Sequence, residues 1–137
     1  MLKKFYRIII LPYTVFLLYL MFFGMGRFQY EDNVIRIKPI VSTIWYIQET
    51  VSLKDIVMIV LGNVVMFIPF GFLGWVFPKL IELQNLIFTF VSAITIVEAL
   101  QYFSRMGIFE VDDIILNTFG VYLGWQIFRF IENRSAV

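Results

Sequence analysis

Seven polar side chains stand within strongly apolar surroundings and are the candidates for chemistry in this chain. The carboxylates among them can act as a general acid or base, bind an amine or hydroxyl group, or hold a hard cation. The guanidinium pairs with phosphate or carboxylate, and the amides both donate and accept hydrogen bonds. In chain order, the seven candidate ligand-binding residues are Asn63, Glu98, Gln101, Arg105, Asp112, Asp113 and Asn117.

The composition indicates that these residues belong to a membrane protein. Of the 137 residues, 61% are hydrophobic and 15% are charged, whereas about 25% of the residues in a typical soluble domain are charged. A net charge of +1 gives no basis for binding nucleic acid. The chain contains neither Cys nor His, which excludes disulfides, thiolate chemistry and His-based zinc sites or general bases. We therefore expect no cofactor and no resident metal.

Four apolar segments approach the length of roughly 20 residues that a helix needs to cross a bilayer. They cover residues 5–23, 56–77, 86–103 and 114–131. Pro12 is expected to kink the first segment and Pro69 to bend the second, because proline removes a helical hydrogen bond. The chain is therefore predicted to be an all-α membrane protein, a compact bundle of four transmembrane helices that forms a single domain over residues 1–137.

The basic residues that flank these segments predict the orientation of the chain. The N-terminus, the loop at 78–85 and the C-terminus together carry six Lys and Arg residues, and the opposite side carries five. Because Lys3, Lys4 and Arg7 cluster before the first span, both termini are predicted to lie in the cytoplasm. No small-residue cleavage site follows this span, which favours an uncleaved anchor over a signal peptide.

The segment between the first two spans, residues 24–55, has a helical pattern of its own. Apolar residues from Ile40 to Val51 recur at helical spacing, and Pro39 suits the first turn of a helix. An interfacial helix that lies on the outer leaflet fits this pattern. An ordinary loop with scattered apolar residues is the alternative.

Residue spacing predicts that polar side chains of the third span share one helix face. Glu98, Gln101 and Arg105 follow one another at intervals of three and four residues. An ionised group inside the bilayer costs at least about 2.5 kcal/mol on insertion scales, so such groups face the bundle interior and pair. We expect Glu98 to pair with Arg105, with Asp112 or Asp113 as an additional partner.

The polar residues of the other spans are predicted to reach the same depth. Asn117 lies one turn inward of Asp113, and Asn63 lies roughly 12 Å below the outer surface at a rise of 1.5 Å per residue. The prediction is a small polar cavity that opens outward. Two structural alternatives stay open: the asparagines hold helices together, or the aspartates cap the fourth helix. Gly120 and Gly124 have the spacing of a close helix–helix contact.

Three ordered motifs in the last three spans carry a resemblance to a known family. They are Asn63-Val-Val-Met-Phe67-Ile-Pro69-Phe-Gly71, then Glu98-Ala-Leu-Gln101 with Arg105, then Val111-Asp112-Asp113-Ile-Ile-Leu-Asn117-Thr-Phe-Gly120. With these motifs the chain resembles the VanZ-like family of small bacterial membrane proteins. Of the family's Asn-Leu-x-Pro-Phe segment, this chain clearly keeps only Pro39. The resemblance implies an integral protein of the bacterial plasma membrane, and the family's namesake confers low-level resistance to the lipoglycopeptide teicoplanin.

Three functions are compatible with the sequence. The first is a non-catalytic protein that binds or shields a lipid-linked cell-wall precursor, or the lipoglycopeptide itself, in the outward-facing cavity and so contributes to resistance. The second is a membrane-embedded enzyme for a lipid-linked substrate, with Glu98, Asp112 and Asp113 as acid–base or metal-holding carboxylates. The third is a regulatory or structural partner of another envelope protein, with the glycines facing that protein. Membrane lipids are expected partners throughout, and oligomer formation stays open.

Overall fold

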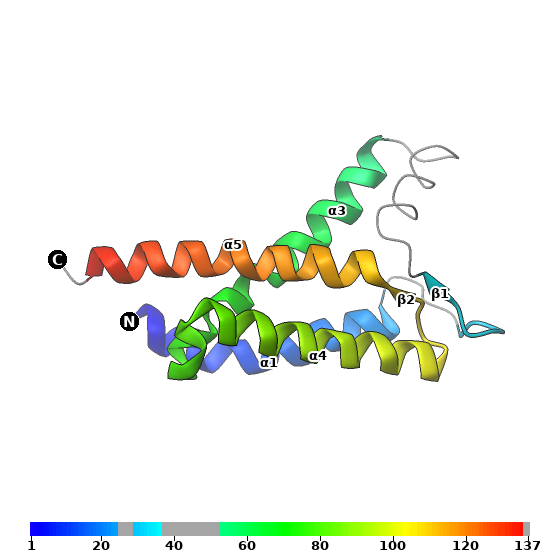
Figure 1. Cartoon of the computed structure of the whole chain (residues 1–137), viewed down its shortest axis with the longest axis horizontal. Coiled ribbons are helices and arrows are strands. Elements are labelled where there is room, and N and C mark those ends of the chain that lie inside the picture. The colour runs from blue at the N-terminus through cyan, green and yellow to red at the C-terminus, as the bar shows by residue number, and fades with distance from the viewer. Residues whose placement is uncertain (25–28, 37–52, 136–137) are drawn as a thin grey trace.

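The computed structural model describes residues 1–24, 29–36 and 53–135, and Figure 1 shows their arrangement. Within these residues the predicted all-α fold is confirmed, with short 3-10 helices and one pair of very short strands in addition. In chain order the elements are α1 (Leu2–Phe23), β1 (Ile35–Arg36), α3 (Leu53–Phe67), η1 (Ile68–Trp75), η2 (Pro78–Ile81), α4 (Leu83–Ser104), β2 (Phe109–Glu110) and α5 (Val111–Ser135). The interfacial helix predicted between Ile40 and Val51 lies outside the described residues.

Three of the described helices, α1, α4 and α5, are long and apolar enough to cross a membrane. Their apolar stretches are Leu2–Phe23, Leu83–Ser104 and Val111–Arg134. All three helices follow the long axis of the molecule (Figure 1). They contain the spans predicted at 5–23, 86–103 and 114–131 and extend them by a few residues, which identifies the chain as a membrane protein.

The second predicted span, residues 56–77, is not one continuous α-helix. α3 ends at Phe67, and the chain continues as the tighter helix η1. Pro69 explains the change, because its ring excludes a helical hydrogen bond and disfavours the α conformation of Ile68. The apolar stretch of this segment, Val60–Trp75, is shorter than the other three, and α3 is inclined to α5 (Figure 1).

Two tyrosines of α1 satisfy backbone carbonyls near this break. The hydroxyl of Tyr6 donates to the carbonyl of Pro69 at 2.8 Å, and the hydroxyl of Tyr13 donates to the carbonyl of Met66 at 2.6 Å. Lipid tails cannot supply such donors, so these bonds fix α1 against the broken second span. α1 itself continues through Pro12 as a helix.

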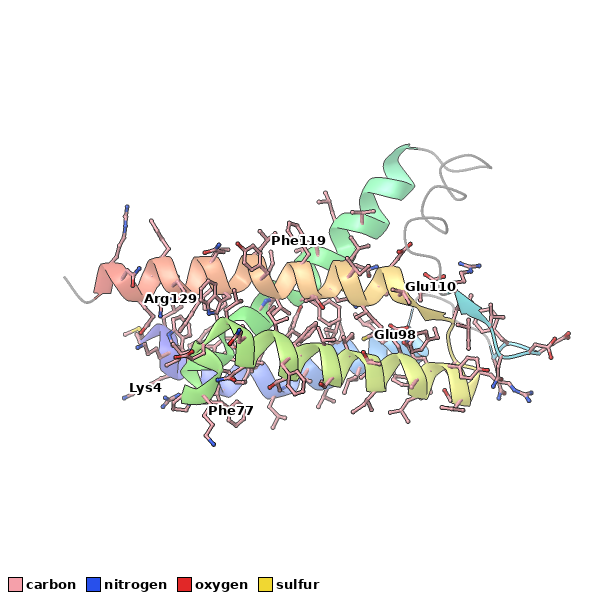
Figure 2. All side chains as sticks on the ribbon, viewed as in Figure 1. Lys4, Phe77, Glu98, Glu110, Phe119 and Arg129 are labelled. Atoms are coloured by element: carbon pink, nitrogen blue, oxygen red, sulfur yellow. The ribbon has the colours of Figure 1, made fainter. Side chains whose placement is uncertain are left out.

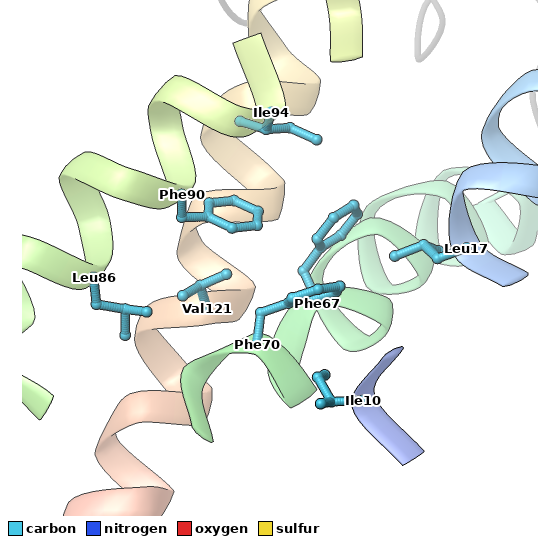
Figure 3. Close-up of a cluster of buried hydrophobic side chains, with 8 residues drawn as sticks. All are labelled: Ile10, Leu17, Phe67, Phe70, Leu86, Phe90, Ile94 and Val121. Atoms are coloured by element: carbon cyan, nitrogen blue, oxygen red, sulfur yellow. The ribbon is translucent and has the colours of Figure 1, made fainter. Parts of the chain in front are cut away.

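An apolar core lies between α1, the α3–η1 segment, α4 and α5. Buried residues along α4 recur every three or four positions, so one face of this helix points inward. Large apolar side chains such as Phe88 and Phe103, which are 77% and 74% exposed, cover the opposite face and suit contact with lipid tails. Figure 3 shows the core cluster, which consists of Ile10, Leu17, Phe67, Phe70, Leu86, Phe90, Ile94 and Val121.

Glycines allow α5 to approach the second span closely. A Cβ atom at Gly120 would collide with the carbonyl of Val64, and one at Gly124 would collide with the carbonyl of Ile68. Gly71 of η1 meets the backbone of Gly124 from the other side. The close contact predicted from the glycine spacing is therefore present, but it lies within this chain. The third functional hypothesis had expected these glycines to face another protein, whereas they pack against the second span of their own chain.

The bundle has two different ends. At the end called here the strand end, β1 pairs in parallel with β2, with Ile35 opposite Phe109 and Arg36 opposite Glu110. The opposite end, called the terminal end, contains the start of α1, the helix η2 and the end of α5 (Figure 1). The start of α1 and the end of α5 thus share one end of the bundle, while the cytoplasmic location of the termini stays a prediction.

Candidate functional site

The predicted polar residues gather at the strand end, where α4 ends and α5 begins. Among the described residues, the buried polar side chains are Glu98, Gln101, Asp112 and Asn117, and all of them are predicted site residues. Their burial confirms that they point into the bundle and away from lipid. Their role in binding stays a prediction, so the partners of each side chain decide what the arrangement can do.

The Glu98 carboxylate is 1% exposed. It follows Phe90 and Ile94 at intervals of four residues on the core-facing side of α4, so helical periodicity directs it inward. Its Oε2 atom accepts a hydrogen bond from the backbone N–H of Glu110 at 3.4 Å, directly ahead of α5 (Figure 2). Glu98 therefore links the third span to the beginning of the fourth.

Asn63 links α3 to the first turn of α5. Its Nδ2 atom donates a hydrogen bond to Oδ1 of Asp113 at 3.0 Å, and both side chains are half-buried. Asp112 and Asp113 occupy the first turn of α5, where the helix dipole favours carboxylates. The bond between Asn63 and Asp113 joins α3 to α5. One of the structural alternatives predicted such a helix-joining role for Asn63.

Asn117 is 2% exposed and lies one turn beyond Asp113. It occupies the same side of α5 as Gly120, Val121 and Gly124, which pack into the bundle. Within the part of the chain that the structure describes, the Oδ1 atom of Asn117 accepts no hydrogen bond. A buried acceptor in this state costs about 1–3 kcal/mol. The buried amide oxygen of Asn117 therefore lowers the stability of the fold. This distinguishes Asn117 from the other buried polar residues, which have partners.

Gln101 has a structural partner. Its side chain is 2% exposed, and Nε2 donates a hydrogen bond to the backbone carbonyl of Met21 at 2.7 Å. Met21 lies in the last turn of α1, where carbonyls lack helical partners. The Gln101 amide group thus caps α1 from α4, and its predicted contact with a ligand stays untested.

The predicted pair between Glu98 and Arg105 is wrong. α4 ends at Ser104, and Arg105 adopts a left-handed backbone conformation with φ 58° and ψ 20°. The prediction required a helix that continues through residue 105, whereas this turn leaves the side chain exposed. Its Nε atom donates to Oδ1 of Asn33 at 3.1 Å, and its backbone carbonyl accepts the N–H of Tyr30 at 2.9 Å. Arg105 therefore organises the segment ahead of β1.

In the described part of the chain, the carboxylates do not gather into a metal-binding group. Within the described ranges, no three Asp or Glu side chains lie close enough together to hold a metal ion. The form of the enzyme hypothesis in which Glu98, Asp112 and Asp113 share a cation is therefore unsupported. The outward-opening cavity stays a prediction, because the chain that leads from β1 to α3, residues 37–52, lies outside the described residues.

An ion pair at the strand end was not predicted from the sequence. Arg36 of β1 and Glu110 of β2 contact each other through their charged groups, with side chains that are 31% and 21% exposed. The two residues are 74 positions apart, and no local pattern connects them. Their pairing follows from the parallel register of the two strands, which sequence spacing does not reveal.

These observations define a class: a small helical membrane protein whose buried polar groups meet at one end of the bundle. The VanZ/LLP1 family model matches residues 10–132. The chain therefore belongs to the VanZ/LLP1 family, as its motifs predicted, and is a VanZ-like envelope protein. No curated protein and no solved structure matches it.

Proposed function

We propose that the protein lies in the bacterial plasma membrane with its strand end outward, and that this end binds or shields the polar headgroup of a lipid-linked or glycopeptide-related ligand. The cluster of basic residues at the terminal end supports this orientation. Membership of the VanZ/LLP1 family supports a role in the envelope. The choice of the strand end follows from the polar residues buried there.

The observation that carries the proposal is the buried Oδ1 atom of Asn117, which accepts no hydrogen bond from the described chain. Lipid tails cannot donate a hydrogen bond to this atom. The neighbouring polar residues Gln101 and Asn63 both have defined partners in the fold. A ligand that brings a donor to Asn117 would compensate the cost of burying this amide.

The groups around the start of α5 define the chemistry of such a ligand. Glu98 and Asp112 are buried carboxylates, and Asn117 contributes an amide oxygen. The Asn117 oxygen can accept a hydroxyl, amide N–H or ammonium donor, so the complementary ligand carries such a donor. The sugars and the peptide of a lipid-linked cell-wall precursor carry such donors.

Arg105 suits the negative charge of the same ligand. A non-glycine residue in the left-handed region costs about 1 kcal/mol, so the arginine at this turn is not explained by backbone preference. Its side chain is exposed, and its bond to Asn33 uses Nε alone among the guanidinium N–H groups. We propose that the remaining N–H groups bind a phosphate or carboxylate of the ligand.

Resistance is the expected consequence of this activity. A protein that covers the headgroup of a cell-wall precursor, or that binds the lipoglycopeptide itself, reduces the encounter between the two. The proposal requires no chemical reaction.

The test is native mass spectrometry of the protein after gentle purification from bacterial membranes. We expect a lipid-linked headgroup to co-purify with the parent protein. Glu98→Gln should lower its retention by about tenfold or more, because it removes a charge-assisted hydrogen bond. Glutamine keeps an oxygen that can accept the N–H of Glu110, so the variant should fold.

Ser92→Ala is the matched control on the same helix, because the Ser92 hydroxyl is exposed and bonds the carbonyl of Phe88 within α4. It should retain as much ligand as the parent. Equal retention by Glu98→Gln and Ser92→Ala, with both proteins folded, would contradict the proposed site.

A further inference from the structure

A cavity lies at the terminal end, opposite the proposed headgroup site. It has a volume of about 500 Å³, and its polar lining comes from Lys3, Lys4, Arg7, Trp75 and Glu132. Lys3, Lys4 and Arg7 lie in the first two turns of α1, and Glu132 lies near the end of α5. The first and last spans of the chain therefore form this cavity together.

Part of the wall is held by a bonded network. Glu132 accepts a hydrogen bond from Nζ of Lys3 at 3.0 Å and another from Nε1 of Trp75 at 2.9 Å. The Nε atom of Arg7 donates to the backbone carbonyl of Trp75 at 2.7 Å. Trp75 is 5% exposed, so it forms a fixed wall between α1 and α5.

Most of the lining surface is apolar, and its charged side chains are Lys3, Lys4 and Arg7 against Glu132, so their net charge is positive. Lys3 is neutralised by its ion pair with Glu132. Within the described residues Lys4 forms no ion pair, and Arg7 uses Nε in its bond to Trp75. The ammonium group of Lys4 and the Nη groups of Arg7 are therefore available to an anion that enters the cavity.

The position of the cavity selects the kind of anion. It lies where two membrane spans end, and Leu2 and Ile131 add apolar surface to the basic residues. Tryptophan, arginine and lysine at such a level are typical of the membrane interface, and basic pockets between spans bind anionic lipid headgroups. We infer that this cavity binds the phosphate of an anionic phospholipid, with Lys4 and Arg7 as the phosphate-binding residues.

The experiment measures phosphatidylglycerol binding to the detergent-solubilised protein by native mass spectrometry, with phosphatidylcholine as the zwitterionic comparison lipid. The parent should prefer phosphatidylglycerol. Each basic residue near an anionic headgroup contributes a factor of about five. Lys4→Gln should therefore weaken phosphatidylglycerol binding about fivefold, and the double variant K4Q/R7Q should weaken it roughly 25-fold.

Lys79→Gln is the control. Lys79 lies in η2 at the same end of the bundle, and its substitution removes the same charge as Lys4→Gln. It should change binding by less than about twofold. Equal losses for Lys79→Gln and Lys4→Gln would overturn the inference, because they would indicate nonspecific attraction to basic residues. Lys4→Gln leaves the bond between Arg7 and Trp75 intact, so its result stands even if K4Q/R7Q does not fold.

A second titration identifies the source of the phosphate. Inorganic phosphate is added to the parent protein loaded with phosphatidylglycerol. Retention of the lipid at millimolar phosphate supports a lipid headgroup site. Complete displacement, with the same sensitivity to Lys4→Gln, would overturn the lipid assignment in favour of a soluble phosphate compound.

Discussion

The first turns of α5 and its middle face the same second span but contact it in different ways. In the middle of α5, Gly120 and Gly124 bring backbone against backbone, with no room for a Cβ atom. In the first turns, Asp113 reaches Asn63 through a side-chain hydrogen bond, and Asn117 holds a buried oxygen that accepts no bond from the described residues. The glycine region in the middle of α5 thus makes a close packing contact with the second span.

The difference shows how a polar residue in a membrane bundle can be assigned a role. Side chains that hold the fold together have partners in it, as Gln101 has in Met21 and Tyr13 has in Met66. A buried polar atom without such a partner lowers stability, so its presence calls for a different explanation. On this criterion, Asn117 is the strongest ligand-binding candidate, while Gln101 has a structural partner and its contact with a ligand stays a prediction.

The largest effect is expected at the glycine contact. Gly124→Ala should destabilise the protein by about 3 kcal/mol or more, because the added methyl group collides with the carbonyl of Ile68. Gly62→Ala in α3 is the control, since a Cβ atom there meets nothing within 4 Å. It should be neutral or stabilising by up to about 1 kcal/mol. Thermal unfolding in detergent compares the two variants, and similar melting temperatures would remove the distinction between the first turns of α5 and its middle.

A smaller effect is expected at the cap of α1. Gln101→Leu should lower the free energy of unfolding by about 1–3 kcal/mol, because it leaves the part-buried carbonyl of Met21 without its donor. Ligand retention by the folded fraction should stay at the parent level. Gln126→Leu is the control, since Gln126 is exposed and bonds Tyr122 on the same helix. Loss of ligand without loss of stability in Gln101→Leu would return Gln101 to the binding site.

The smallest change in stability is expected at the turn after α4. Arg105→Gly should shift the free energy of unfolding by less than about 1 kcal/mol, because relief of the left-handed conformation offsets the lost bond to Asn33. Binding of an anionic ligand should nevertheless weaken several-fold. A large loss of stability would show that Arg105 serves the fold, and unchanged ligand binding would remove it from the proposed site.

Much of the fold could be predicted from the sequence, because long apolar runs define membrane spans and proline locates a break. The burial of Glu98 also followed from its position between apolar neighbours on α4. The failures arise where local spacing no longer determines geometry. The pair of Glu98 with Arg105 assumed a continuing helix, whereas the left-handed turn at residue 105 ends it.

Contacts between distant residues could not be predicted either. Gln101 and Met21 are 80 positions apart, and Arg36 and Glu110 are 74 apart. Such pairs depend on how whole helices and strands are placed, which helical periodicity does not specify. The same limit applies to Asn117, because the sequence places it in the polar layer without indicating that its oxygen has no donor in the described fold.

The most direct test of the account is Asn117→Leu, measured for stability and for ligand retention in the same preparation. Leucine has a similar branched shape and removes the buried acceptor, so the ligand-free protein should be as stable as the parent or more stable by about 1–2 kcal/mol. Retention of the lipid-linked ligand should fall by about tenfold or more. A less stable variant that retains its ligand fully would contradict the account and would place Asn117 among the residues that hold the helices together.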